Sequence, residues 1–123
     1  MEVELTEGRA TVAIDPERGG RLSSLRVDGL ELLVTAADSP LDWGCYPMAP
    51  FAGRIRDGRF RYAGREHQLD RNLPPHAIHG TVYDQPWKVE HAERTDAALV
   101  TDLGDGWPFP GRVIHRIRVR DDA

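Results

Sequence analysis

The sequence predicts an all-β protein, and three observations support that prediction. Apolar and polar residues alternate with period two wherever a period is visible, as half-buried strands require. Glycine-containing pairs separate several of the apolar runs and indicate tight turns. No stretch of ten or more residues carries the i, i+3, i+4, i+7 stripe of an amphipathic helix. These patterns predict about seven to nine short strands in an antiparallel β-sandwich or a barrel.

The N-terminal half contains one strand and two hairpins in this interpretation. Residues 10–15, ATVAID, form a strand whose apolar face is made by Ala10, Val12 and Ile14. The pair Asp28-Gly29 lies between two apolar runs, RVDGLELLV, and predicts the first hairpin. Residues 59–69, RFRYAGREHQL, predict the second, with Phe60 and Tyr62 on one face of its first strand.

The C-terminal part contains a third hairpin and a last strand. Residues 87–104, WKVEHAERTDAALVTDLG, predict that hairpin, with Trp87, Val89 and His91 alternating against Lys88 and Glu90. The last strand is predicted within RVIHRIRVR, and one of its faces is made by Val113, His115, Ile117 and Val119.

Length and composition restrict the classes of protein that fit. A chain of 123 residues is expected to form a single domain, residues 1–123, with one core. The formal net charge of −4 gives a nucleic-acid partner no overall attraction. The single cysteine, Cys45, excludes an internal disulfide and a cysteine-based zinc site. No apolar run approaches a membrane span, so no membrane contact and a cytoplasmic location are expected.

Two long segments fall outside the strand pattern and contain an unusual share of the reactive side chains. They span residues 35–58 and 70–86, and each contains three prolines. Connections this long are usually functional in a compact domain, and binding residues favour loops on a rigid scaffold. The polar and aromatic candidates are Trp43, Tyr46, Arg54, Asn72, His76, His79, Tyr83 and Asp84.

Several kinds of site fit these segments poorly. His76 and His79 form an H-x-x-H pair, but no helical spacing or nearby cysteine supplies further ligands, so no metal site is expected. No serine or cysteine has a nucleophile-elbow context, and Cys45, between aromatic residues, is expected to be partly buried and inert. Arg18-Gly-Gly-Arg21 lacks the strand-turn-helix context of a phosphate loop. Polar recognition by aromatic, arginine and histidine side chains remains, with a carbohydrate as one candidate among small polar ligands.

A resemblance to a known family makes this prediction more specific. The stretch YPMAPFAGRIRDGRFRYAGREHQLDRN, followed by HAIHG, Trp87 and GWPFPGRV, closely resembles the N-terminal part of the aldose 1-epimerases, the galactose mutarotase family. The resemblance implies a β-sandwich of the galactose mutarotase type that interconverts the α and β anomers of a free hexose such as glucose or galactose. In that reaction a base takes the proton of the anomeric hydroxyl while an acid protonates the ring oxygen, and no cofactor is needed.

The resemblance also assigns roles to particular residues. Arg54 matches the arginine that binds sugar hydroxyls, and His79 matches the histidine of the family's H-G motif, which contacts the sugar near the reacting centre and is the catalytic candidate here. Asn72 matches a recurrent asparagine ahead of that motif and is included among the substrate-binding candidates, although a loop-shaping role suits it better. His76 is interpreted as rim or scaffold.

The chain also departs from the family pattern. Family members are commonly more than twice as long, and their general acid histidine and general base glutamate follow the region that this chain matches. His115, Glu66 and Glu90 do not match those residues, because they lie on predicted strands. Gly80-Thr81 stands where the family often has Gly-Gly. The chain is therefore interpreted as an incomplete epimerase that self-associates or pairs with a separate C-terminal half. The alternatives are a non-catalytic carbohydrate-binding module and a hexose-phosphate 1-epimerase that uses Arg54 and Arg56 on the phosphate.

Overall fold

The computed structural model describes residues 1–121 and contains eleven strands and one turn of 3-10 helix. Eight strands have four or more residues, within the range that the sequence predicts; the other three have two residues each, and of these only β4 falls in a predicted hairpin. The strands are β1 (Val3–Glu7), β2 (Ala10–Asp15), β3 (Arg21–Val27), β4 (Leu30–Glu31), β5 (Arg54–Ile55), β6 (Arg59–Tyr62), β7 (Arg65–Gln68), β8 (Ala77–Ile78), β9 (Lys88–Ala92), β10 (Asp96–Asp102) and β11 (Arg112–Arg118), and the helical turn is η1 (Arg56–Gly58).

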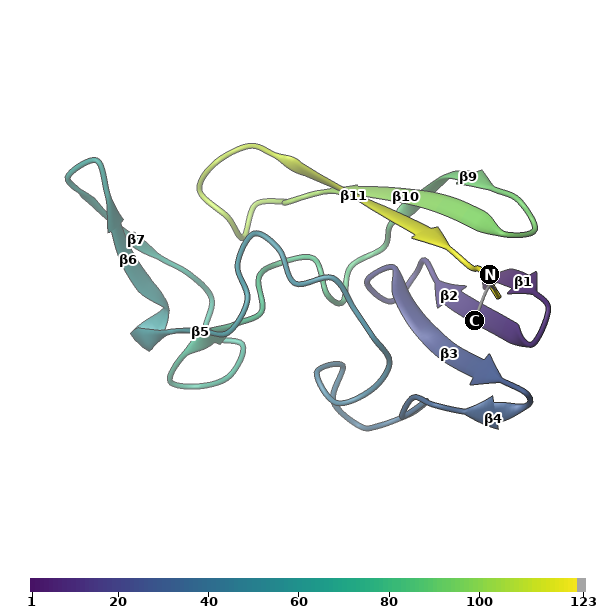
Figure 1. Cartoon of the computed structure of the whole chain (residues 1–123). Coiled ribbons are helices and arrows are strands. Elements are labelled where there is room, and N and C mark those ends of the chain that lie inside the picture. The colour runs from purple at the N-terminus through teal and green to yellow at the C-terminus, as the bar shows by residue number, and fades with distance from the viewer. Residues whose placement is uncertain (122–123) are drawn as a thin grey trace.

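Two antiparallel sheets form the body of the molecule. One has the order β1-β2-β3-β4 and the other the order β11-β10-β9, so every neighbouring pair is joined by a hairpin or a short turn. The two sheets lie face to face at the right of Figure 1. This arrangement confirms the predicted antiparallel sandwich and its hairpins. The β6–β7 hairpin projects away from the sandwich as a separate two-stranded unit (Figure 1).

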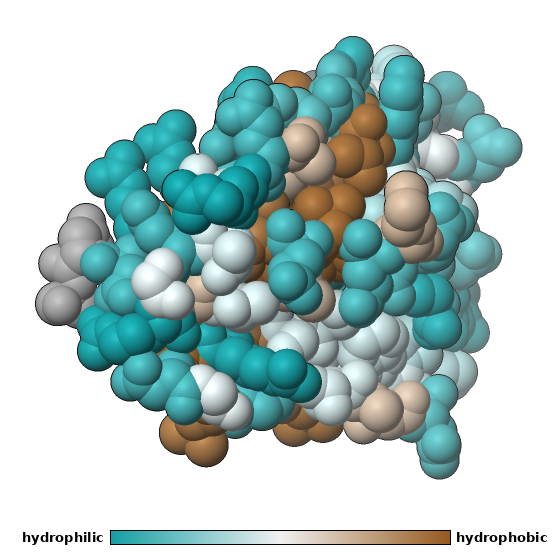
Figure 2. All heavy atoms as spheres, turned by 90° about the vertical axis from the view of Figure 1, so that its right-hand side faces the viewer, coloured by the Kyte–Doolittle hydropathy of each residue, from teal (hydrophilic) through white to brown (hydrophobic). Residues whose placement is uncertain are grey.

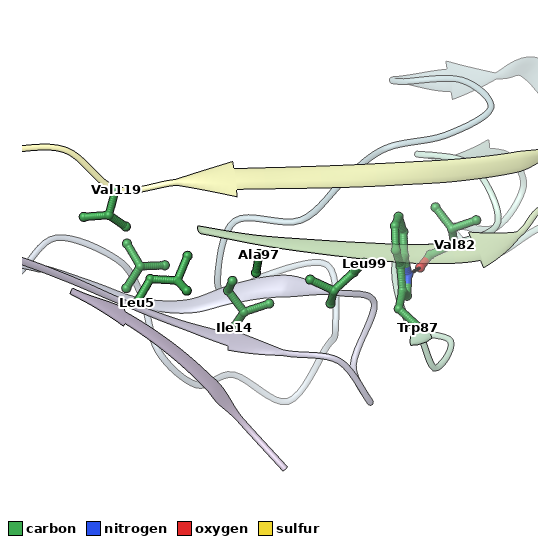
Figure 3. Packing of buried hydrophobic residues seen from close by; sticks show 8 residues of the cluster. Leu5, Ile14, Val82, Trp87, Ala97, Leu99 and Val119 are labelled. Atoms are coloured by element: carbon green, nitrogen blue, oxygen red, sulfur yellow. Dashed lines mark hydrogen bonds between the residues drawn. The ribbon is translucent and has the colours of Figure 1, made fainter. Parts of the chain in front are cut away.

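The core lies between the two sheets. Side chains from β1 and β2 point toward side chains from β10 and from the end of β11, and Trp87 closes one end against Val82 (Figure 3). The Trp87 indole N–H donates to the Val82 carbonyl over 3.0 Å, which satisfies the one polar atom of that ring. The core residues are Leu5, Val12, Ile14, Val82, Trp87, Ala97, Leu99 and Val119. The predicted inward faces of residues 10–15 and of the last strand are therefore confirmed.

One predicted face is wrong. Val89 lies opposite the buried Leu99, but a bulge shifts the register, so that His91 lies opposite Ala98 instead of following Val89 inward. Glu90 is the extra residue at this bulge, and an extra residue moves every later side chain to the other face. His91 is consequently exposed and forms an ion pair with Asp96, with 2.7 Å between Nε2 and Oδ1.

A second cluster, made of aromatic rings, holds the β6–β7 hairpin in place. Phe60 stacks on Trp107 with ring centroids 5.1 Å apart, and Trp107 also contacts Phe51 at 5.9 Å and Phe109 at 6.1 Å. Tyr62 packs edge-on against Phe109. The segment between β10 and β11 and the segment before β5 are thereby tied to the hairpin.

Some apolar residues lie at the surface. The face at the right of Figure 1 is mostly hydrophilic, but hydrophobic residues show through its upper middle and again along its lower margin (Figure 2). Leu30, Leu32 and Val34 are 66%, 52% and 63% exposed, and they begin at β4, an edge strand. Within residues 1–121, no helix has the length and apolar character that a membrane span requires.

Candidate functional site

The two aperiodic segments meet through two short strands. Strand β5 pairs antiparallel with β8, so that Arg54 lies opposite Ile78 and Ile55 opposite Ala77. In Figure 1 this pair lies between the sandwich and the projecting β6–β7 hairpin. Arg54 lies on β5 and His79 directly follows β8, so the pairing of these strands brings the two backbones near each other, although 25 positions separate the residues in the chain.

His79 is fixed in one orientation by Gly53. The His79 amide donates to the Gly53 carbonyl, and the Gly53 amide donates to His79 Nδ1, each over 3.0 Å. Because Nδ1 accepts this hydrogen bond, the neutral imidazole carries its proton on Nε2. The ring therefore offers an N–H donor from Nε2.

The backbone at His79 is held in a conformation that side chains rarely adopt. Its φ is 60°, in the left-handed region, where a non-glycine residue costs on the order of 1–3 kcal/mol. Gly80 follows with φ 81°, and a Cβ on Gly80 would overlap the carbonyl oxygen of Ala49. That same oxygen accepts a hydrogen bond from the Thr81 amide over 2.9 Å. The H-G pair therefore has a physical basis: the glycine admits the Ala49 backbone, and this approach holds the strained histidine in place.

The positive charge of Arg54 affects the pKa of His79. Burial lowers the pKa of His79, and the positive charge of Arg54 lowers it further. No carboxylate among the described residues counters these two causes. The His79 imidazole is therefore neutral at pH 7, while the exposed Arg54 guanidinium forms no hydrogen bond or ion pair within residues 1–121 and is available to a ligand.

We expect the histidines to titrate in a defined order. Burial lowers the pKa of both His79 and His115, whereas the hydrogen bond with Asp96 raises the pKa of His91. Proton NMR of the imidazole Cε1–H groups against pH should show His79 and His115 titrating below, and His91 above, the ordinary value near ~6.5. Below that pH the unfolded chain binds more protons at His79 and His115, so acidification weakens the fold through these two residues. A midpoint for His79 above that of His91 would contradict this account.

Asn72 serves the loop that carries His79. Its Nδ2 donates to the Ile78 carbonyl over 2.9 Å, and its Oδ1 accepts from the Ile78 amide over 2.8 Å. The same Nδ2 lies 3.0 Å from the Tyr83 hydroxyl. His76 also supports the loop, because its Nδ1 accepts a hydrogen bond from the Asp57 amide over 3.0 Å. Both side chains are thus used to hold β8 and the turn before β6.

Aromatic rings line the inner side of the site. The Tyr46 ring centroid lies 6.2 Å from that of His79 and 6.1 Å from that of Tyr83. The Tyr46 hydroxyl donates to the Leu41 carbonyl over 2.8 Å, which anchors the ring. The neighbouring Cys45 is exposed, so the expectation that it is partly buried is wrong. Its main chain pairs with Leu22.

His115 is remote from this site in its contacts. It lies on β11, its Nδ1 is 3.2 Å from the Gly20 carbonyl, and its ring packs edge-on against Trp87. Glu66 and Glu90 are exposed on the β6–β7 hairpin and on β9. A pocket beside the site includes Asn72, Gly80, Thr81 and Tyr83 in its lining, but Arg54 and His79 do not line it. The two candidate sugar-binding side chains, Arg54 and His79, therefore lie outside this pocket.

The sequence interpretation missed one residue that organises the site. Arg21 is completely buried and contacts both aperiodic segments. A signal was present in Gly19-Gly20, which precede it with φ of 79° and 61°. A Cβ on Gly19 would overlap the Tyr83 carbonyl, so these glycines let a second segment approach the start of β3.

Comparison with known proteins places these features in a family. The family model described as aldose 1-epimerase matches residues 1–123. The chain is 33% identical over 82 residues to the uncharacterized Escherichia coli protein YphB, covering 63% of this chain and 28% of that protein. It is 28% identical over 96 residues to the uncharacterized Escherichia coli protein YihR, covering 75% of this chain and 31% of that one.

Solved structures show the same fold. A crystal structure from Escherichia coli K12, provisionally named an aldose 1-epimerase, superposes with a TM-score of 0.85 at 26% identity and covers 97% of this chain. The GalM/aldose epimerase homologue from C. elegans superposes with a TM-score of 0.80 at 20% identity and covers 98% of this chain. The chain spans 42% of the length of each of these two structures.

Proposed function

Because the chain belongs to the aldose 1-epimerase family, we propose that it binds a free aldose through Arg54 and His79 and provides the substrate-binding part of an epimerase site. The observation that carries this proposal is the orientation of His79, which two hydrogen bonds with Gly53 fix. The imidazole, neutral and with its proton on Nε2, lies on a strained backbone that the H-G pair requires, and the exposed Arg54 guanidinium, which forms no hydrogen bond within residues 1–121, is near enough to lower its pKa. Backbone strain of this kind concentrates at functional sites.

The chemistry of a sugar suits these two groups. Arg54 offers a planar fork of donors that can bind two neighbouring hydroxyl oxygens. His79 offers one donor from Nε2, which can bind the ring oxygen or a hydroxyl close to the anomeric carbon. As a neutral N–H donor, Nε2 can stabilise the negative charge that develops on a sugar oxygen during ring opening, and it keeps its proton while doing so.

Ring opening needs a general acid and a general base, each worth about 10²–10⁴-fold in rate. His115 contacts Gly20 and Trp87, and Glu66 and Glu90 are exposed on β7 and β9, so none of these three side chains contacts His79. We therefore assign binding and orientation of the sugar to this chain, with His79 as its catalytic contact. We assign the general acid and the general base to residues outside 1–123.

Arg54→Ala is expected to weaken binding of D-galactose or D-glucose roughly tenfold or more, since hydrogen bonds to charged groups contribute about 1.5–3 kcal/mol. His79→Ala is expected to weaken it roughly two- to tenfold, since hydrogen bonds of a neutral group contribute about 0.5–1.5 kcal/mol. His91→Ala is the matched control, because that side chain is exposed on β9 and its partner is Asp96. Affinity can be followed by tryptophan fluorescence or by amide NMR. Equal affinity in all three variants would contradict the assignment.

Anomer exchange separates the enzyme from the alternative, a binding module. Pure α-D-galactose is added to the protein, and the anomer ratio is followed by NMR against the spontaneous rate. We expect binding without acceleration by the chain alone, and acceleration once a protein that supplies the acid and base is added. Binding that never leads to acceleration with any such protein would support a carbohydrate-binding module.

Incomplete coverage of the sandwich suggests a partner. Strand β11 is an edge strand of its sheet, and Ile114 on that strand is 43% exposed. Free strand edges and exposed apolar residues promote association. We propose that the chain self-associates or pairs with a separately encoded C-terminal half. Light scattering should then report a mass above that of one chain at micromolar concentration, and a monodisperse, stable monomer would contradict the proposal of self-association.

A further inference from the structure

Arg21, at the start of β3, is a buried arginine whose hydrogen bonds all go to backbone carbonyls. Its Nε donates to the Arg18 carbonyl over 2.7 Å, and its Nη2 donates to the Tyr83 carbonyl over 2.7 Å. Its Nη1 donates to the carbonyls of Pro40 and Trp43, each over 2.8 Å. One guanidinium thus joins β3 to residues 39–46 of the first aperiodic segment and to residues 80–85 of the second.

Two aromatic rings cover the faces of this guanidinium. The Arg21 Cζ lies 4.3 Å from the Trp43 ring centroid and 4.8 Å from the Tyr46 ring centroid. The Tyr46 ring in turn lies 6.2 Å from the His79 ring. A continuous set of contacts therefore leads from Arg21 through Tyr46 to His79.

The arrangement is expensive for a merely space-filling residue. Burying a guanidinium without a carboxylate partner costs free energy, and within residues 1–121 Arg21 forms no ion pair. Burial lowers the pKa of Arg21. The ordinary pKa of a guanidinium is so high that the group nevertheless stays charged and keeps all its donors. Only a planar fork can reach four carbonyls from three segments at once.

We propose that Arg21 is a positioning residue for the sugar site: it holds the Tyr46 ring and the segment after Gly80 so that His79 Nε2 faces the ligand. This inference rests on the proposed function for its sugar readout alone. The contacts from Arg21 to Tyr46 and from Tyr46 to His79 are independent of it. Arg21 itself is completely buried, so a ligand at the surface cannot contact it.

The test compares Arg21→Met, which removes the donors, with Arg21→Lys, which keeps the charge but loses the planar fork. Arg18→Met is the matched control, because the Arg18 side chain lies 5.9 Å from the same Trp43 ring but is half exposed and pairs with Asp84. We expect Arg21→Met to weaken D-galactose binding about tenfold or more, since misplacing a group by ~1 Å can cost a factor of ~100. Arg21→Lys should fall between, and Arg18→Met should match the wild type.

Arg21→Met could fail to fold, so a second variant, with its own control, targets the Tyr46 ring, which contacts both Arg21 and His79. Tyr46→Leu removes the ring and should weaken D-galactose binding in the same way. Tyr62→Leu is the matched control, because Tyr62 is 63% exposed on β6 and its ring packs against Phe109, and it should bind as the wild type does. A folded Arg21→Lys and a folded Tyr46→Leu with wild-type affinity would overturn the inference.

A readout without sugar separates this inference from the proposed function. In wild type the pKa of His79 is lowered by burial and by Arg54, so loosening Tyr46 should raise it toward the ordinary value. The pKa should rise in Arg21→Lys and Tyr46→Leu and stay unchanged in Arg18→Met and Tyr62→Leu. If the wild type bound no aldose, the proposed function would fail while this pattern would still support positioning. An unchanged His79 pKa in Arg21→Lys and Tyr46→Leu would overturn it.

Discussion

Leu99→Ala is expected to lower the free energy of unfolding by about 2–5 kcal/mol. Leu99 is 0% exposed and lies on β10 between the two sheets, where its side chain points toward those of β1 and β2 (Figure 3). Removing three carbons there leaves a cavity that the antiparallel sheets cannot close without moving their hydrogen-bonded backbones. Small domains have about 5–15 kcal/mol of stability in all, so this one change removes a large part of it.

Chemical denaturation followed by circular dichroism measures the effect of Leu99→Ala. Ile114→Ala is the matched control, because Ile114 lies on the neighbouring strand β11 but is 43% exposed on the outer face. That control should cost about 1 kcal/mol or less. Similar losses for the two variants would mean that the space between the sheets is not the core that stabilises this protein.

Gly80→Ala is expected to abolish aldose binding and to destabilise the loop that carries His79. Gly80 has φ 81°, and a Cβ would overlap the Ala49 carbonyl oxygen, so the backbone of one segment must move. That carbonyl also accepts the Thr81 amide, and the parallel bridge from Ala49 to Gly80 would be lost with it. His79 immediately precedes this point, so its imidazole would leave the position that Gly53 fixes.

Gly64→Ala provides the matched control for Gly80→Ala. Gly64 lies in the turn of the β6–β7 hairpin with φ 79°, but a Cβ there meets nothing within 4 Å. It carries the same cost of a left-handed alanine, on the order of 1 kcal/mol, without the clash. D-galactose binding should survive in Gly64→Ala and disappear in Gly80→Ala. Retained binding in Gly80→Ala would show that the Ala49 contact does not position His79.

The sequence predicts most of the strands of four or more residues, because a two-sided sheet imposes period two on every strand that has one buried face, but β1 (Val3–Glu7) was not among the predicted elements. Val12 and Ile14 on β2 and the inner face of β11 illustrate this, since each follows the predicted alternation. The bulge at Glu90 is an exception to this rule. One extra residue turns the His91 side chain to the outer face of the sheet, although apolar and polar residues still alternate in the sequence. Local pattern cannot reveal where a partner strand skips a residue.

The site was harder to predict because non-local contacts build it. Strands β5 and β8 have two residues each and exist only because the two aperiodic segments pair, so no local period could have revealed them. The resemblance to the epimerases pointed to Arg54 and His79, and the structure places Arg54 on β5 and His79 directly after β8. Arg21 carries no family motif, and its role follows only from four carbonyls that the fold brings together.

The central claim, that His79 Nε2 binds the sugar, is most directly tested by ¹⁵N NMR of the imidazole nitrogens during a titration with D-galactose at pH 7. We predict a neutral ring with its proton on Nε2, and a shift of Nε2 on adding sugar that is much larger than that of Nδ1, which Gly53 already occupies. His115, buried against Trp87, should not respond. Unchanged His79 nitrogens at sugar concentrations that saturate any other signal, or a proton found on Nδ1, would contradict the account.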